Sequence, residues 1–184
     1  MYVLEEFNLG YIAHPKTASS ATSRIVRDTL GAKTIGTHHA VDDELCRRIL
    51  ETGGRVMATI RNPFDLMVSW YFHYAHRRPD KVMEPFKEWL PNQIAKPNQY
   101  LIQGMFFGLQ WANCILRFEY LQEDFDRLCD EVGLPRTIIE PFNISVKREG
   151  RTYQEMYDSE LRRLIQENFA DELAAGDYSF EEIA

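Results

Sequence analysis

A lysine followed by small and hydroxyl-bearing residues occurs near the start of the chain. The run is His14-Pro15-Lys16-Thr17-Ala18-Ser19-Ser20-Ala21-Thr22, between the apolar segment 9–13 and a helical pattern. A strand, a tight loop and a helix start are therefore expected here. The first N–H groups of a helix have no intrahelical partner and the helix dipole adds positive charge, so such a junction binds anions. Lys16 adds a full charge and the hydroxyls add donors, which suits a phosphate or sulfate.

This loop does not match an ordinary ATP or GTP loop. The Walker pattern places glycines before its lysine, whereas the run 14–22 has no glycine and its lysine precedes the hydroxyls. A plain N-capped helix beside an exposed lysine would account for the same residues without any ligand. From this stretch alone, both explanations stay open.

A second candidate anion site begins where the clearest central strand, 55–60, ends. Arg61 follows that strand directly, and Asn62 is a good helix N-cap. Ser69 lies on the same side of the predicted helix as Asp65, one turn further on. An arginine and a hydroxyl held by two rigid elements could clamp a phosphate from two directions. Alternatively, Arg61 only pairs with Asp65, and Ser69 only packs the helix.

Alternating strand and helix patterns in the first part of the chain predict an α/β fold. The predicted strands are 9–13, 33–37, 55–60 and 113–118, and the predicted helices are 20–30, 41–50, a segment after 62, 85–90, 98–109, 122–132 and 158–169. Such alternation implies parallel strands with helices on the faces, and ligands then bind beyond the carboxyl ends of the strands. We expect a single domain over 1–184, built on a central, mostly parallel sheet. The tail 178–180 is expected to dock by its aromatic side chains.

Composition narrows the class of protein. A chain of 184 residues with 45% hydrophobic content can bury a real core. It shows no apolar run of membrane-spanning length and no signal-peptide pattern, and its three widely spaced cysteines favour neither disulfides nor a metal site. The formal charge of −7 disfavours nucleic acid and highly sulfated polyanions as partners. A cytoplasmic protein with a small anionic ligand is therefore expected, with no nucleic-acid partner and no membrane span.

Taken together, these stretches resemble the sulfotransferases that use 3′-phosphoadenosine 5′-phosphosulfate (PAPS), particularly the compact bacterial and carbohydrate-type branch. Pro15-Lys16-Thr17 and the residues after it look like the family's 5′-phosphosulfate loop, which would span 14–22. Arg61-Asn62-Pro63-x-Asp65-x-x-Val68-Ser69 is similar to its 3′-phosphate motif, which would span 61–69. The resemblance implies a P-loop-like, nucleotide-binding sulfotransferase fold.

Weaker matches extend the resemblance toward the end of the chain. One is the segment 116–121, and the other is 171–180, which resembles the family's closing D…GY.F pattern with Asp177 placed before Tyr178. The resemblance therefore covers the chain from about residue 10 to residue 181.

The resemblance also implies site roles. Lys16 would contact the bridging oxygen and the sulfuryl group as the phosphate leaves. The 5′-phosphosulfate would lie on the backbone amides of Thr17, Ala18, Ser19, Ser20, Ala21 and Thr22. Arg61 and Ser69 would hold the 3′-phosphate, and a late basic turn would complete that site through Lys147, Arg148 or Arg151. Such a mechanism requires no metal, because fixed positive groups stabilise the leaving phosphate.

Transfer to a hydroxyl or amine usually needs a base that removes a proton from the acceptor. His39 is the first choice, because it follows the second predicted strand on the sheet edge expected to carry both motifs, and His39-Ala40-Val41 resembles a His-Ala-Thr stretch of bacterial relatives. A histidine titrating near neutrality suits the task. His38 competes closely, since one residue of register decides which ring points inward, and Glu119 is a distant third. A solvated pair of loop histidines stays the alternative.

The leading expectation is a cytoplasmic sulfotransferase that moves a sulfuryl group from PAPS to a hydroxyl or amine of a carbohydrate, lipid or small-molecule acceptor. The region 72–113 would shape the acceptor site. Because the chain is short for this family, a partner subunit in a homo-oligomer, or an open groove, would complete that site. The alternatives are a phosphotransferase on a related nucleotide-binding fold and a nucleotide-binding module without catalysis.

Overall fold

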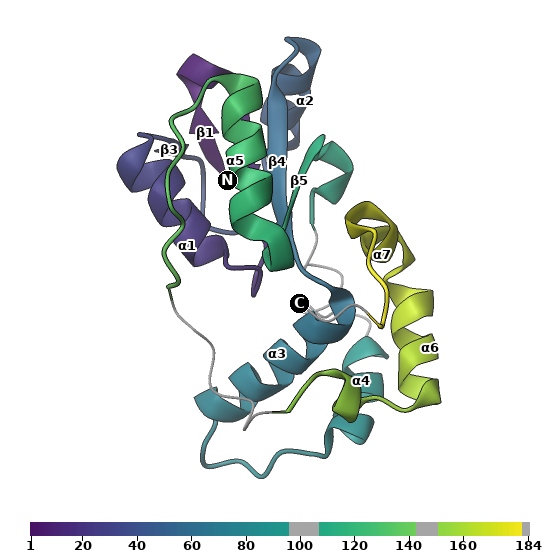
Figure 1. Ribbon diagram of the computed structural model, residues 1–184. Coiled ribbons are helices and arrows are strands. Elements are labelled where there is room, and N and C mark those ends of the chain that lie inside the picture. The colour runs from purple at the N-terminus through teal and green to yellow at the C-terminus, as the bar shows by residue number, and fades with distance from the viewer. Residues whose placement is uncertain (96–106, 143–150, 182–184) are drawn as a thin grey trace. The chain divides into compact units, whose positions relative to one another are not determined.

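An open five-stranded sheet with helices makes this an α/β chain, as the sequence predicts (Figure 1). The computed structural model describes residues 1–95, 107–142 and 151–181. The chain divides into two compact units, one comprising Met1–Ile60 and Phe106–Asn143 and the other Arg61–Met105 and Ile144–Ala184. The expectation of a single domain stays a prediction.

The sheet of the first unit is mixed, which corrects the expectation of a mostly parallel one. Its strands are β1 (Tyr2–Leu4), β2 (Leu9–Ile12), β3 (Lys33–Thr34), β4 (Arg55–Ile60) and β5 (Cys114–Arg117), in the order β3-β1-β2-β4-β5. β2, β4 and β5 pair in parallel, whereas β1 is antiparallel to both β2 and β3. Sequence analysis missed β1, because a strand of 3 residues is too short to give a clear period.

The direction of β1 decides which ends of the strands meet. Because β1 runs opposite to both of its neighbours, β3 points the same way as β2, and β4 and β5 follow β2. The carboxyl ends of β2, β3 and β4 therefore lie at one edge of the sheet. The expectation that the segments after the first three predicted strands emerge at a common edge is thus confirmed by the strand directions.

Helices of the first unit cover both faces of the sheet (Figure 1). They are α1 (Ser19–Arg24), which continues as the π-helical η2 (Ile25–Thr29), α2 (Asp43–Glu51), α5 (Leu121–Val132) and the short η1 (Glu5–Phe7), η3 (Leu109–Trp111) and η4 (Phe118–Tyr120). Alternate strand residues face opposite ways. Tyr11 and Met57 therefore pack on the face of α5 with Phe125, whereas Ile12 and Ala58 pack on the face of α2.

The regular elements of the second unit, among the residues that the structure describes, are all helices. Its elements are α3 (Pro63–Arg77), α4 (Phe86–Ile94), η5 (Gln154–Met156), α6 (Ser159–Asn168) and α7 (Ala170–Gly176). Aromatic rings fill its core, and the ring of Phe180 packs edge-on against Phe64 with centroids 5.0 Å apart. The predicted docking of the aromatic tail is therefore confirmed.

Most predicted helices are confirmed within a few residues of their predicted ends. The predicted helix 98–109 lies largely outside the described residues, and α7 was not predicted because its sequence, Ala-Asp-Glu-Leu-Ala-Ala-Gly, carries no clear apolar stripe. Within the described ranges, none of the helices combines the length and the apolar character that crossing a membrane requires.

Candidate functional site

The lysine loop of the first unit has an unusual backbone. Lys16 and Ala18 both adopt the left-handed conformation, with φ of 63° and 58°. Residues with a Cβ avoid this region unless the surroundings impose it, and such residues concentrate at binding sites. A left-handed residue followed by helical ones also turns successive N–H groups toward one point, which makes a concavity for an anion.

The start of α1 leaves amides available to such an anion. The carbonyl of Ala18 accepts the first helical hydrogen bonds, from the amides of Ala21 and Thr22 at 2.9 and 3.1 Å. The amides of Ser19 and Ser20 precede these bonds, and at a helix start such groups need a partner from elsewhere. The loop therefore has the backbone arrangement that the sequence predicts for an anion site.

Thr59, near the end of β4, holds this loop from inside the protein. The Thr17 hydroxyl donates to the His14 carbonyl at 2.8 Å and lies 2.7 Å from the Thr59 hydroxyl, which in turn lies 3.1 Å from the Tyr11 hydroxyl. The single hydroxyl proton of Thr17 is donated to the His14 carbonyl. The Thr59 hydroxyl must therefore donate to the Thr17 oxygen, and the Tyr11 hydroxyl must donate to the Thr59 oxygen. The Thr17 hydroxyl, expected to face a ligand, is thus engaged in a buried chain, and only its amide is left to serve an anion.

His14 is the second internal support of the loop. Its ring is 0% exposed, with Nδ1 2.9 Å from the Thr59 carbonyl and Nε2 2.9 Å from the Phe107 carbonyl. Burial lowers the pKa of His14, so the ring is neutral at neutral pH and donates through one nitrogen at a time. His14 ties the ends of β2 and β4 to the segment that precedes η3.

His39 presents a proton acceptor beside this loop. Its Nδ1 lies 2.6 Å from the carbonyl of Ala13, the residue immediately before the loop 14–22. A carbonyl oxygen can only accept, so Nδ1 carries the proton, and Nε2 of the neutral ring holds a lone pair. The residue as a whole is exposed.

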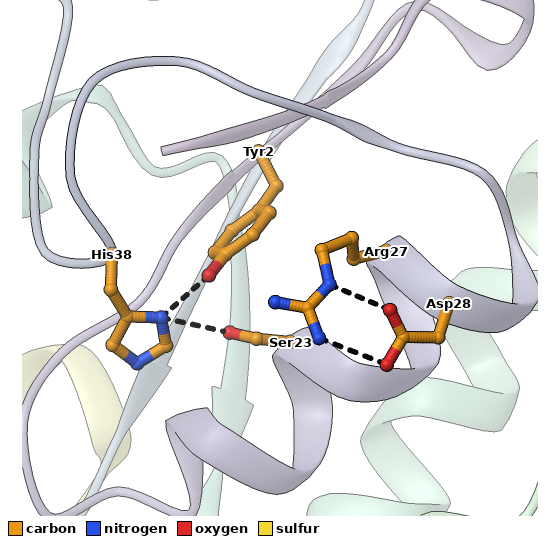
Figure 2. Close-up of polar contacts among 5 residues, drawn as sticks. All are labelled: Tyr2, Ser23, Arg27, Asp28 and His38. Carbon is orange, nitrogen blue, oxygen red and sulfur yellow. Dashed lines mark hydrogen bonds and ion pairs between the residues drawn. The ribbon is translucent and has the colours of Figure 1, made fainter.

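His38 has a different environment from its neighbour in sequence. Its Nδ1 lies 2.6 Å from the Tyr2 hydroxyl and 3.5 Å from the Ser23 hydroxyl, as Figure 2 shows. Its Nε2 is buried and has no hydrogen-bond partner among the described residues. Burial first, and then nearby positive groups, lower the pKa of His38 to about 4. The geometry therefore favours His39 over His38 as a base, while Glu119 lies in η4 after β5.

The arginine motif lies in the second unit and is closely paired. Arg61 Nε donates to Asp65 at 2.6 Å, Nη2 contacts the same carboxylate, and Nη1 lies 3.4 Å from the Ser69 hydroxyl. Both members of the ion pair are largely buried. The pairing that sequence analysis left as an alternative is therefore present, and Ser69 lies beside the same guanidinium.

Asn62 connects this motif to the tail of the chain. Its Oδ1 accepts from the Phe64 amide at 3.1 Å, which confirms the predicted N-cap, and its Nδ2 donates to the Ser179 carbonyl at 2.9 Å. The tail reaches this position through a tight turn. Asp177 is left-handed with φ of 53°, and a Cβ on Gly176 would lie 2.2 Å from the Tyr178 ring. Sequence analysis found the cap but had no signal for its bond to residue 179.

The remaining predicted site residues are only partly described. Lys147 and Arg148 lie outside the described residues, and Arg151 belongs to the second unit. The predicted acceptor region 72–113 includes the undescribed residues 96–106 and contributes to both units. Within the described ranges, no group of His, Cys, Asp and Glu side chains could hold a metal ion.

Comparison of the sequence with protein-family models finds no match, and comparison with curated proteins finds none either. The function must therefore be inferred from the geometry and chemistry of the residues in the candidate site. Two of these had no sequence signal: Thr59, one residue of an apolar strand, and Tyr2, on the missed strand β1. Their roles depend on partners about 40 positions away along the chain.

Thr59→Val should destabilise the first unit while keeping the shape of the side chain. The hydroxyls of Tyr11 and Thr17 would each lose a buried partner, so the free energy of unfolding should fall by about 1 to 3 kcal/mol. Urea denaturation measures this loss. Thr34→Val, on the exposed edge strand β3, is the matched control and should change stability by less than about 0.5 kcal/mol. An equal, small effect of both substitutions would show that the buried chain does not stabilise the loop.

Stability should also fall as the pH is lowered from about 7 to about 5. The pKa values of His14 and His38 are lowered in the folded protein from an ordinary 6.5. In this range the unfolded chain binds more protons than the folded one, so unfolding becomes easier at lower pH. Urea midpoints across the range measure the effect. His38→Gln should flatten the dependence, whereas the exposed His76→Ala should not, and identical slopes in all three proteins would contradict the account.

Proposed function

We propose that this protein is a sulfotransferase that moves a sulfuryl group from PAPS to a hydroxyl or amine of a carbohydrate, lipid or small-molecule acceptor. One observation carries the proposal: at the carboxyl edge of the sheet, the left-handed lysine loop adjoins His39, an exposed residue whose Nδ1 is held by the Ala13 carbonyl. An anion cradle and a proton acceptor are the two parts that sulfuryl transfer requires.

The loop would bind the 5′-phosphosulfate through its backbone. The amides of residues 17–22 include those of Ser19 and Ser20, which lie ahead of the helical hydrogen bonds of α1. Lys16 would place its positive charge near the bridging oxygen. Because the loop is supported by Thr59 and His14, these donors are held in place before the donor substrate arrives, which favours electrostatic stabilisation.

The transfer itself would be a single in-line displacement. The acceptor oxygen forms a bond to sulfur while His39 Nε2 takes its proton, and the bond between sulfur and the bridging oxygen breaks. The electron pair of the broken bond stays on the phosphate oxygen, where Lys16 stabilises the added charge. The products are the sulfated acceptor and 3′-phosphoadenosine 5′-phosphate, with the proton on His39.

The 3′-phosphate would be recognised by Arg61 and Ser69 in the second unit. Asp65 fixes the orientation of the guanidinium but also balances its charge. A phosphate bound there needs further positive charge, and this requirement supports a contribution from Lys147, Arg148 or Arg151. Such a site would distinguish PAPS from ordinary adenine nucleotides.

The cytoplasm is proposed as the location of the reaction. The three cysteines, Cys46, Cys114 and Cys129, are all unpaired. Burial raises the pKa of each of these thiols to about 11, which keeps them in the inert protonated form.

Binding of 3′-phosphoadenosine 5′-phosphate should require both its 3′-phosphate and Arg61. Calorimetric titration should show that AMP, ADP and ATP bind far more weakly, and that Arg61→Ala weakens binding by about 10- to 100-fold, as expected for lost charge-assisted hydrogen bonds. Arg77→Ala, at the exposed far end of α3, is the matched control and should bind as the wild type does.

Arg61→Ala also leaves the Asp65 carboxylate without this partner, so thermal unfolding should be measured alongside. Arg61→Lys keeps the charge without the two-pronged geometry and should bind with intermediate affinity. Equal binding of all the nucleotides, or no binding by a folded wild type, would exclude PAPS as the donor.

Turnover should depend on Lys16 and His39. Transfer of labelled sulfate from PAPS to a panel of hydroxylated acceptors should fall by about 10²- to 10⁴-fold in His39→Ala, and comparably in Lys16→Ala. Nucleotide affinity of His39→Ala should be nearly unchanged, because its ring is assigned to the acceptor. The exposed Arg47→Ala in α2 serves as the control. Near-normal turnover of His39→Ala would move the base to His38 or elsewhere.

Other outcomes would favour the alternative functions. ATP turnover with Mg²⁺ and none with PAPS would indicate a phosphotransferase. Nucleotide binding without any turnover would indicate a non-catalytic module.

A further inference from the structure

We propose that Tyr2 and His38 are positioning residues for His39, which hold its ring in the orientation that leaves Nε2 able to accept a proton. The inference rests on the proposed function, in which His39 is the base. It concerns two residues to which that function assigns no role. One is a tyrosine on β1, the strand between β3 and β2, and the other is the histidine that precedes the base.

The contacts around His39 support this positioning role. Its Nδ1 is held by the Ala13 carbonyl at 2.6 Å, and the ring of His38 packs edge-on against its ring, with centroids 4.2 Å apart and planes at 63°. His38 is in turn held at Nδ1 by the Tyr2 hydroxyl at 2.6 Å. The ring of Tyr2 is buried and stacks on Tyr11 with centroids 5.9 Å apart. A continuous series of contacts thus leads from the sheet to an exposed imidazole.

The tautomer of His38 follows from its bond with Tyr2. A phenol is a better donor than acceptor, and Tyr2 therefore donates to Nδ1, so the ring proton of His38 lies on Nε2. Charging the ring would place a second proton on Nδ1, so the Tyr2 hydroxyl would have to turn from donor to acceptor. Because Nε2 is buried without a partner among the described residues, the cation would also be poorly solvated on that side.

The charged groups around His38 favour its neutral form. The positive groups that face it are the N-terminal ammonium of Met1 and Arg27, together with His39 when it is protonated. Arg27 is paired with Asp28, as Figure 2 shows, and Ser23 on α1 contributes only a hydroxyl. All of these positive groups disfavour a second cation at His38. A neutral His38 does not repel the proton that His39 acquires, whereas an imidazolium 4.2 Å away would.

Tyr2→Phe tests this inference because it removes the hydroxyl and keeps the buried ring. In ¹⁵N-labelled wild-type protein, NMR should show His38 protonated on Nε2 and His39 on Nδ1, with His38 neutral down to about pH 4. In Tyr2→Phe, the hydroxyl that donates to Nδ1 is gone, so the ring proton of His38 should no longer be confined to Nε2.

The kinetic consequence should appear in kcat and not in the donor KM. The kcat of Tyr2→Phe should fall by about tenfold, a part of the contribution of general-base catalysis, while KM for PAPS stays unchanged. Ser23→Ala should have little effect, because its hydroxyl lies 3.5 Å from Nδ1, and Tyr71→Phe in α3 is the control for loss of a tyrosine hydroxyl.

The outcomes separate this inference from the proposed function. If the wild type transfers sulfate and Tyr2→Phe matches it in kcat, the positioning role is wrong and the function stands. A His38 protonated on Nδ1 in the wild type would also overturn the role. If the wild type transfers nothing, the proposed function fails, and the NMR spectra of wild type and Tyr2→Phe alone decide whether the pair orders His39.

Discussion

Thr59 is the residue on which the carboxyl edge of the sheet depends. Its hydroxyl lies within hydrogen-bond distance of both Tyr11 and Thr17, and its carbonyl lies 2.9 Å from His14 Nδ1. All four side chains are 0% exposed, so each polar group must find its partner within the protein. Thr59 supplies a partner to each of the other three side chains. This constraint accounts for a loop that tolerates the left-handed backbone of Lys16 and Ala18 without a glycine.

The same edge places two adjacent histidines in opposite environments. His38 turns inward, where burial and then the positive groups around it lower its pKa and keep the ring neutral, and where its Nδ1 meets the Tyr2 hydroxyl. His39 turns outward, and the Ala13 carbonyl selects its tautomer. One residue of backbone register therefore separates a half-buried imidazole from an exposed one. The backbone that carries them follows β3, whose direction is set by its antiparallel pairing with β1.

Several contacts of the second unit meet at the start of α3. Asn62 caps the helix and binds the tail at Ser179, and Arg61, the residue before it, pairs with Asp65 one turn later. The tail is fixed in turn by the ring of Phe180 and by the Tyr153 hydroxyl, which donates to the Phe180 carbonyl at 2.8 Å. The orientation of the Arg61 guanidinium is therefore supported by residues far away in the sequence, as a rigid binding group requires.

The sequence by itself determined the local elements and the chemical types of the candidate site. The strand 55–60, the cap at Asn62 and the hydroxyl-rich loop after Lys16 were predictable, because apolar periodicity and capping depend on residues within a few positions of one another. The tertiary structure alone decided the antiparallel insertion of β1, the bond of Thr59 to Thr17, and the bond of Tyr2 to His38, which join residues 42 and 36 positions apart. Such contacts depend on strand order and register, which no local pattern encodes.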